Sequence, residues 1–139
     1  LCYEERIPFI QTRWPLARVV PLILGASPDC LRIASLIETV IPGGFFIASS
    51  DLSHFHPLEE ARLLDDRVIN SFLSLDPSVF MKSLAEGGEA CGRYPILTLL
   101  HLARMKAAGK AVKLDQSTSA DAGAGRTEVV GYFSGMVYR

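Results

Sequence analysis

The chain has 139 residues and a mass of 15.2 kDa, which is the length of one domain. Hydrophobic residues make up 49% and charged residues 21%, so the chain can bury a sizeable core and disorder is excluded as its main state. The net charge of −1 points neither to nucleic acid nor to an anionic membrane surface, and no apolar run approaches the roughly 20 residues of a membrane-spanning helix.

The first half of the chain predicts two strands separated by a helix. Residues 18–24 are rich in Val, Ile and Leu and predict a buried strand. Ser27 and Pro28 then predict the N-cap and first turn of a helix, and the Pro-Gly-Gly sequence at 42–44 ends it. The apolar run 45–49 predicts a second strand.

The second half predicts more helices and a strand at the C-terminal end. A polar loop, 50–57, leads into a helix that continues to Leu75, and Asp76 and Pro77 cap and open the next one. The remaining predicted elements are a helix from Pro95 to Gly109, a strand at 111–114, a flexible loop at 117–126 and a strand at 128–138. This alternation predicts a single α/β domain over 1–139, with a mainly parallel central sheet flanked by helices and room for an antiparallel edge.

The loop after the second predicted strand carries the first candidate site. In open α/β sheets, ligands bind beyond the carboxyl ends of the strands. The histidine side chain is the one most often used near neutral pH as an acid, a base or a metal ligand, so His54 is a candidate for each role, and Asp51 could orient its imidazole. The structural alternative is a helix-capping Asp51 followed by surface histidines.

Two other chemistries fit the same loop less well. His54 and His56 form an H-x-H pair of the kind seen in some zinc hydrolases, but Pro57 follows at once and Asp51 is the only nearby third ligand. A Ser-His-Asp triad could combine Asp51 and His54 with a serine of this segment, Ser49, Ser50 or Ser53. Triad members usually come from different loops, however, and the chain has no G-x-S-x-G turn.

Cys91 is the second candidate. It lies among glycines just before a predicted helix, whose N-terminal partial charge favours a thiolate, and Arg93 adds a positive charge. A thiolate is a soft metal ligand, whereas the structural alternative is a small buried cysteine. The odd cysteine count argues against a disulfide framework and predicts a reducing, cytoplasmic setting, with Cys30 packed in a helix. His101 lies in mid-helix, where packing is the expected role.

Six segments spread along the chain form a recognisable set. They are Glu4–Ile10 (EERIPFI), Val20–Gly25 (VPLILG), Ser49–His54 (SSDLSH), Leu75–Pro77 (LDP), Cys91–Ile96 (CGRYPI) and Val129–Tyr132 (VVGY). Together they resemble the Memo-like family, protein B of the AmmeMemoRadiSam set. The resemblance spans nearly the whole chain but only the C-terminal half of the family's length. The sequence starts without Met and has no signal-peptide layout, which also predicts a piece of a longer protein.

This resemblance implies a fold similar to that of the class III extradiol dioxygenases, which bind non-haem Fe(II) through two histidines and a carboxylate. By the same resemblance Cys91 stands where the carboxylate ligand would be, and His54 is the acid–base candidate with Asp51 as its partner. Substrate contacts are then expected at Arg93, Ser53 and His56.

The family's two metal-binding histidines lie in its N-terminal half, and Leu1 stands where an E-H-S motif would place a histidine. We therefore expect an incomplete metal-dependent redox or dioxygenase-like module, with Fe(II) or Cu between Cys91 and ligands outside the chain. The alternatives are a peptide- or phosphate-binding signalling module, with a small molecule or peptide near His54 and Arg93, and a partner subunit of a radical-SAM protein. An exposed apolar face would favour self-association or binding of the missing half.

Overall fold

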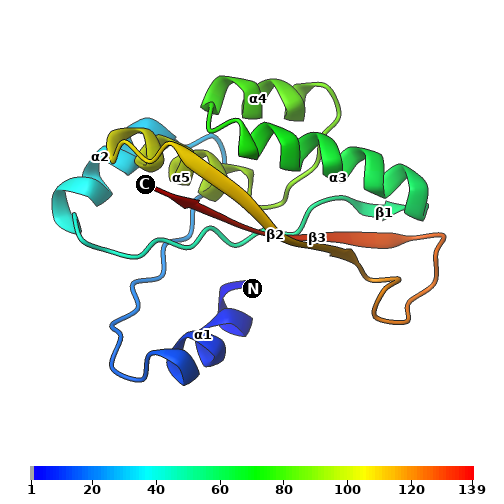
Figure 1. Ribbon diagram of the computed structural model, residues 1–139, viewed down its shortest axis with the longest axis horizontal. Coiled ribbons are helices and arrows are strands. Elements are labelled where there is room, and N and C mark those ends of the chain that lie inside the picture. Colours follow the sequence, from blue (N-terminus) through cyan, green and yellow to red (C-terminus); the bar gives the residue numbers. More distant parts are fainter. Residues whose placement is uncertain (1) are drawn as a thin grey trace.

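The computed structural model describes residues 2–139, without the side chains of residues 2, 3 and 5 (Figure 1). Leu1 and the thiol of Cys2 therefore lie outside the described part. None of the described helices has the length and apolarity needed to cross a membrane. The elements within the described residues are α1 (Cys2–Arg13), α2 (Cys30–Val40), β1 (His54–His56), α3 (Leu58–Leu73), α4 (Pro77–Ala85), α5 (Arg93–Met105), β2 (Lys110–Thr118) and β3 (Val129–Tyr138).

The described strands form one antiparallel sheet in the order β1-β3-β2. Strands β2 and β3 make a long hairpin, paired from Lys110 with Tyr138 to Thr118 with Gly131, and β1 pairs with the other edge of β3. The fold is thus mixed α and β, but the prediction of a mainly parallel central sheet is wrong. Strands β2 and β3 follow each other directly in the chain and pair antiparallel as a hairpin, while the predicted strands at 18–24 and 45–49 have no backbone hydrogen-bond partner among the described residues.

Those two segments, 18–24 and 45–49, run as open chain outside the sheet (Figure 1). No described backbone hydrogen bond joins either segment to another part of the chain. The two predicted strands are therefore wrong for this structure. Their apolar composition is typical of strands, but a strand exists only when a neighbour satisfies its N–H and C=O groups.

The helix predictions are largely confirmed, because capping signals are local. Asp76 caps α4 by accepting the N–H of Ser78 at 2.7 Å, and Pro77 opens that helix as predicted. The N-cap of α2 is Asp29 rather than Ser27, since its carboxylate accepts the N–H of Arg32 at 2.9 Å. Helix α5 begins at Arg93, ahead of Pro95, whose missing N–H costs nothing in the first helical turn.

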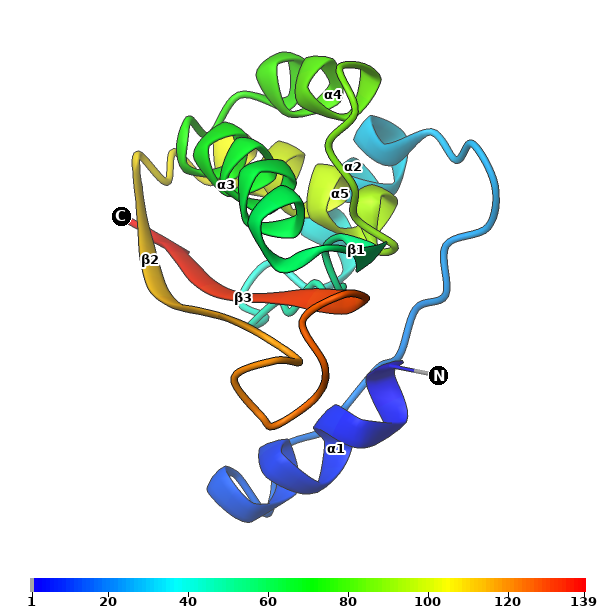
Figure 2. The ribbon, with the colours of Figure 1, turned by 90° about the vertical axis from the view of Figure 1, so that its right-hand side faces the viewer.

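Helices α2, α3, α4 and α5 lie on one side of the β2–β3 hairpin, and α1 lies on the other (Figure 2). Helix α3 packs on α4 and on the sheet, while α5 packs on α2 and α4. Phe80 and Leu100 are completely buried where these helices meet, and Phe72 makes an edge-on ring contact with Phe133 of β3. The core therefore lies between the helices and the sheet, and the candidate site lies at its edge.

Candidate functional site

The loop with the two histidines is anchored to β3 and α3. The N–H of Leu52 donates to the carbonyl of Gly131 at 2.9 Å, and the N–H of Gly131 donates to the carbonyl of Ser53 at the same distance. The N–H of Ser53 in turn donates to Oδ1 of Asp65 at 3.0 Å. These hydrogen bonds hold the backbone of residues 51–53 in place, directly ahead of the two histidines in the chain.

Asp65 is a buried carboxylate under this loop that sequence reasoning missed. Burial raises its pKa, while the hydrogen bond from Ser53 opposes that shift. Its Oδ2 atom has no hydrogen-bond partner among the described residues and lies where a side chain on Gly131 would be, so that glycine is required by close approach. The signal was a charged residue on the apolar face of α3, four positions after the buried Ala61.

Cys91 and Asp51 are joined by two hydrogen bonds, each donated by a backbone N–H. The N–H of Cys91 donates to the carbonyl of Asp51 at 3.1 Å, and the N–H of Asp51 donates to Sγ of Cys91 at 3.1 Å. The thiol itself is exposed. The two candidate segments, 40 residues apart in sequence, therefore form one site, with the sulfur next to the N-terminus of α5.

Gly92 and Ser50 make a further contact where these two segments meet. The N–H of Gly92 donates to Oγ of Ser50 at 2.8 Å, and that hydroxyl also lies 3.7 Å from Sγ of Cys91. A Cβ atom on Gly92 would lie 2.2 Å from the carbonyl oxygen of Ser49. The glycine next to Cys91 thus permits a close backbone approach, here to the neighbouring loop.

His54 and Asp51 lie together at the surface of this junction. His54 Nε2 is 3.9 Å from Oδ2 of Asp51, and both side chains are about one-third exposed. That distance suits an ion pair with a protonated imidazole and is too long for a direct hydrogen bond. The next residue, Phe55, has a left-handed backbone (φ +62°), which is strained for an aromatic residue, and its ring lies against that of His54.

His56 is turned to a different set of partners. Its Nε2 lies 2.9 Å from Oε1 of Glu89, and its Nδ1 lies 3.3 Å from Oε1 of Glu60. The hydrogen bond to Glu89 is the main reason that the pKa of His56 is raised; burial opposes it and the charge of Glu60 adds to it. With both nitrogens facing carboxylates, His56 does not share a ligand position with His54.

Glu89 is the second residue that sequence reasoning missed. Its Oε2 accepts the backbone N–H of His54 at 3.2 Å, so one carboxylate joins the Cys91 loop to both histidines. Burial raises the pKa of Glu89, but the hydrogen bonds from His56 and from His54 outweigh burial and leave that pKa lowered. Nothing local marked this residue, because its partners lie 33 and 35 positions away.

The remaining candidates are placed as follows. Arg93 is exposed at the start of α5, with its guanidinium over the ring of Tyr94. Ser53 is 0% exposed, so its side chain lies inside the protein beside Asp65 rather than in contact with solvent. Cys30 is buried, as expected for packing, and burial lowers the pKa of the half-buried His101.

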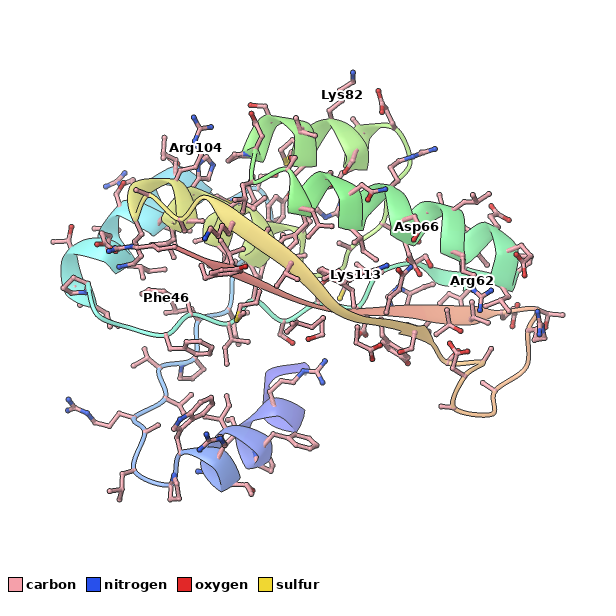
Figure 3. All side chains as sticks on the ribbon, viewed as in Figure 1. Phe46, Arg62, Asp66, Lys82, Arg104 and Lys113 are labelled. Atoms are coloured by element: carbon pink, nitrogen blue, oxygen red, sulfur yellow. The ribbon has the colours of Figure 1, made fainter. Side chains whose placement is uncertain are left out.

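A second polar surface lies where α3 crosses β2, with Arg62 and Asp66 on the helix and Lys113 on the strand (Figure 3). Gln116 donates to Asp66 at 2.8 Å and accepts from Lys113 at 2.9 Å. Gln116 thus links Asp66 of the helix to Lys113 of the strand, so this surface ties the helix to the hairpin. In the adjoining loop, Asp121 accepts both N–H and O–H of Thr118, which lowers its pKa.

The structure is thus a mixed α and β domain with the thiol of Cys91 on one loop and the imidazole–carboxylate pair of His54 and Asp51 on the adjoining loop. A family model described as Memo-like protein matches residues 2–136, and the chain belongs to that family. This confirms the resemblance predicted from the sequence.

Its curated relatives include three archaeal proteins, each named a MEMO1 family protein. The one from Archaeoglobus fulgidus is 34% identical over 143 residues, which cover 98% of this chain and 54% of that protein. The one from Thermoplasma acidophilum is 35% identical over 135 residues (94% and 50%), and the one from Methanosarcina barkeri is 30% identical over 137 residues (93% and 52%). The chain thus spans about half the length of the curated relatives it matches.

Proposed function

We propose that this chain supplies the proton-transfer pair and one thiolate ligand of a non-haem, metal-dependent redox site of dioxygenase-like type. The proposal rests mainly on two hydrogen bonds between Asp51 and Cys91. The N–H of Cys91 donates to the carbonyl of Asp51, and the N–H of Asp51 donates to Sγ of Cys91, both at 3.1 Å. They bring a soft metal donor and a titratable imidazole to one surface, as such chemistry requires.

The donor set of this chain fits a metal only in part. Cys91 offers one exposed sulfur, and the described side chains include no group of three His, Cys, Asp or Glu residues that could hold a metal ion. Non-haem iron and copper sites use several ligands, so further ligands would have to come from outside the described residues. A bound Fe(II) or Cu would supply the redox chemistry.

Within this chain, His54 is proposed to accept or give a proton at Nε2. The carboxylate of Asp51 lies 3.9 Å from this nitrogen, within ion-pair range. The Glu89 carboxylate holds the backbone of His54 in place through its N–H. The substrate is a small molecule or peptide that reaches this exposed junction, and Arg93 and His56 lie on the segments that flank it.

The test is an anaerobic titration of the whole chain with Fe(II), Cu and Zn, beside four variants. Cys91→Ala removes the donor, whereas Cys91→Ser keeps a hydrogen-bond acceptor for Asp51 but is a poorer ligand for soft metals. We expect both to weaken binding of the preferred metal by at least about tenfold, and His54→Asn to leave the affinity unchanged. The control Cys30→Ala removes a buried thiol and should also bind normally. Equal affinity in wild type and both Cys91 variants would exclude Cys91 as a ligand.

A non-catalytic alternative is the binding of a phosphate or phosphopeptide. It is favoured by Arg93, an exposed cation at the N-terminal end of α5, where helix N–H groups attract anions. Titration with inorganic phosphate and with a phosphotyrosine peptide, both in chelator, tests it. Binding that persists without metal and is lost in Arg93→Gln would favour this function over the metal site.

A further inference from the structure

Phe55 combines an exposed ring with a strained backbone in the middle of strand β1. The residue is 73% exposed, and its backbone is left-handed at φ +62°, a conformation that suits glycine and strains an aromatic residue. Because the ring is exposed, its burial does not offset that strain. The other described non-glycine residues with a left-handed backbone lie in connections between helices or strands: Ser27, Leu75 and Ala107. Backbone strain inside a regular element is typical of active sites and ligand-binding sites.

The pairing of β1 with β3 explains why this ring is exposed. His54 pairs with Val130 and His56 pairs with Val129, so Phe55 is an extra residue without a partner on β3. Such a β-bulge next to a binding site re-aims a side chain. The two flanking histidines are half-buried, whereas Phe55 is exposed. The bulge therefore directs one large apolar side chain into solvent beside the candidate site.

The exposed ring lies against the imidazole of the proposed proton-transfer pair. The ring centroids of Phe55 and His54 are 5.8 Å apart, and the ring planes are inclined by 54°. Nε2 of His54 is in turn 3.9 Å from Oδ2 of Asp51. A small ligand that rests on the ring of Phe55 can therefore reach the imidazole and the carboxylate with its neighbouring atoms.

Carboxylates dominate the charge around this ring. The described hydrogen bonds of Asp51 use only its backbone, so its partly exposed carboxylate can accept one from a ligand. Glu60 and Glu89 both face His56 close by. The cation of the flanking segment, Arg93, has its guanidinium over a neighbouring tyrosine ring. Aromatic rings stack on other flat rings and attract cations to their faces, so the ligand that fits is flat and positively charged.

We propose that Phe55 determines the specificity of this site by stacking on the aromatic part of a small organic cation whose ammonium group is bound by Asp51. The inference rests on the proposed function, because it takes the surface around His54 to be the place where the substrate binds. It narrows the substrate from any small molecule or peptide to a protonated amine that carries an aromatic ring. Stacking on Phe55 itself requires no metal.

The experiment titrates the whole 139-residue chain, in chelator, with two amines that differ in ring saturation, benzylamine and cyclohexylmethylamine. Amide shifts of residues 51–55 in nuclear magnetic resonance report binding at this surface. We expect benzylamine to bind at least about threefold more tightly than cyclohexylmethylamine, as the energy of an aromatic pair implies. Benzyl alcohol, the uncharged analogue, should also bind more weakly than benzylamine. Equal affinity for benzylamine and either of the other two compounds would overturn the proposal.

Matched variants assign the preference to one ring. Phe55→Leu should remove the preference for benzylamine over cyclohexylmethylamine, and Phe55→Tyr should retain it. Phe9→Leu is the control, because Phe9 is 74% exposed but lies on α1. Asp51→Asn should remove the preference for benzylamine over benzyl alcohol. A preference for the aromatic amine that survives in Phe55→Leu, or is lost in Phe9→Leu, would overturn the proposal.

Two comparisons separate this inference from a structural role of Phe55 and from the proposed function. Phe55→Gly relieves the strain and should unfold at a higher denaturant concentration than Phe55→Ala, yet both should lose the preference for benzylamine. Unchanged benzylamine affinity in both variants would overturn the proposal. Metal titration of the wild type gives an independent result. A preference for benzylamine without metal binding would support this ligand class and contradict the metal-dependent function, whereas metal binding through Cys91 without that preference would overturn this inference alone.

Discussion

Glu89 Oε1 lies 2.9 Å from Nε2 of His56, and this contact joins the loop that carries Cys91 to strand β1. The second oxygen of the same carboxylate accepts the N–H of His54. The spacing of the two loops therefore depends on an acidic residue whose described hydrogen bonds go to the His56 ring and the His54 backbone, and not to the sulfur of Cys91.

This pair predicts how stability depends on pH. The pKa of His56 is raised above its usual 6.5, so its contribution is complete below that value and is lost as the pH rises through the raised pKa. The pKa of Glu89 is lowered below its usual 4.5, so its contribution is lost as the pH falls through the lowered pKa. Glu89→Gln should cost about 0.5–1 kcal/mol of unfolding free energy between about pH 4.5 and 6.5, a modest value because both groups are partly exposed.

Denaturant unfolding of wild type and Glu89→Gln from pH 4 to 9 measures this difference. The control is Glu86→Gln, which breaks a surface pair with Lys82 that contains no histidine. Its effect should not change between pH 6 and 8. A Glu89→Gln effect that is equally flat over that range would contradict the assignment.

Two substitutions of the buried Asp65 separate the effect of its charge on stability from the effect of its hydrogen bond. Its raised pKa means that its stabilisation is complete below 3.8, its usual value, and is lost as the pH rises. Asp65→Asn keeps an oxygen for the N–H of Ser53, so it should be at least as stable as wild type at pH 7. Asp65→Ala leaves that N–H unpaired and should cost about 1–3 kcal/mol. Thermal unfolding at pH 7 decides, and an Asn variant less stable than the Ala variant would refute this.

Gly92 tests the contact between the two loops. A methyl group at this position would press on the carbonyl of Ser49 and the side chain of Ser50. Gly92→Ala should therefore cost about 1–3 kcal/mol, as overpacking typically does, and speed deuterium exchange at Asp51 and Cys91. Gly109→Ala is the control, because nothing lies within 4 Å of its added carbon. Equal stability of the two variants would show that the loops do not meet as described.

Phe55 tests the strain beside His54. Its ring is largely exposed, and its φ of +62° favours glycine. Phe55→Gly and Phe55→Ala remove the same ring, but only glycine relieves the strain of about 1–2 kcal/mol. The glycine variant should thus be the more stable of the two in chemical denaturation, the reverse of the usual order for an extended segment. Alanine being the better residue here would argue against the left-handed backbone.

Local signals explain which parts of the fold could be predicted. Asp76 and Pro77 fixed the start of α4, because a cap acts on the next three residues only. The apolar run at 45–49 was just as strong a signal, yet it forms no strand here, since pairing depends on a neighbour elsewhere in space. The same limit hid Glu89, whose partners are distant in sequence. Asp65 was marked locally by a charge on the apolar face of α3, and the chemical types of Asp51, His54 and Cys91 also stood out locally.

The hydrogen bond from the Asp51 amide to Sγ of Cys91 couples the sulfur directly to the backbone of the neighbouring loop. Any reaction that adds a group to this exposed thiol or changes its charge also changes the acceptor that holds Asp51. The backbone amide of Asp51 is consequently a built-in reporter. Its nuclear magnetic resonance frequency would respond to alkylation, oxidation or metal capture at Cys91 without any label near the site.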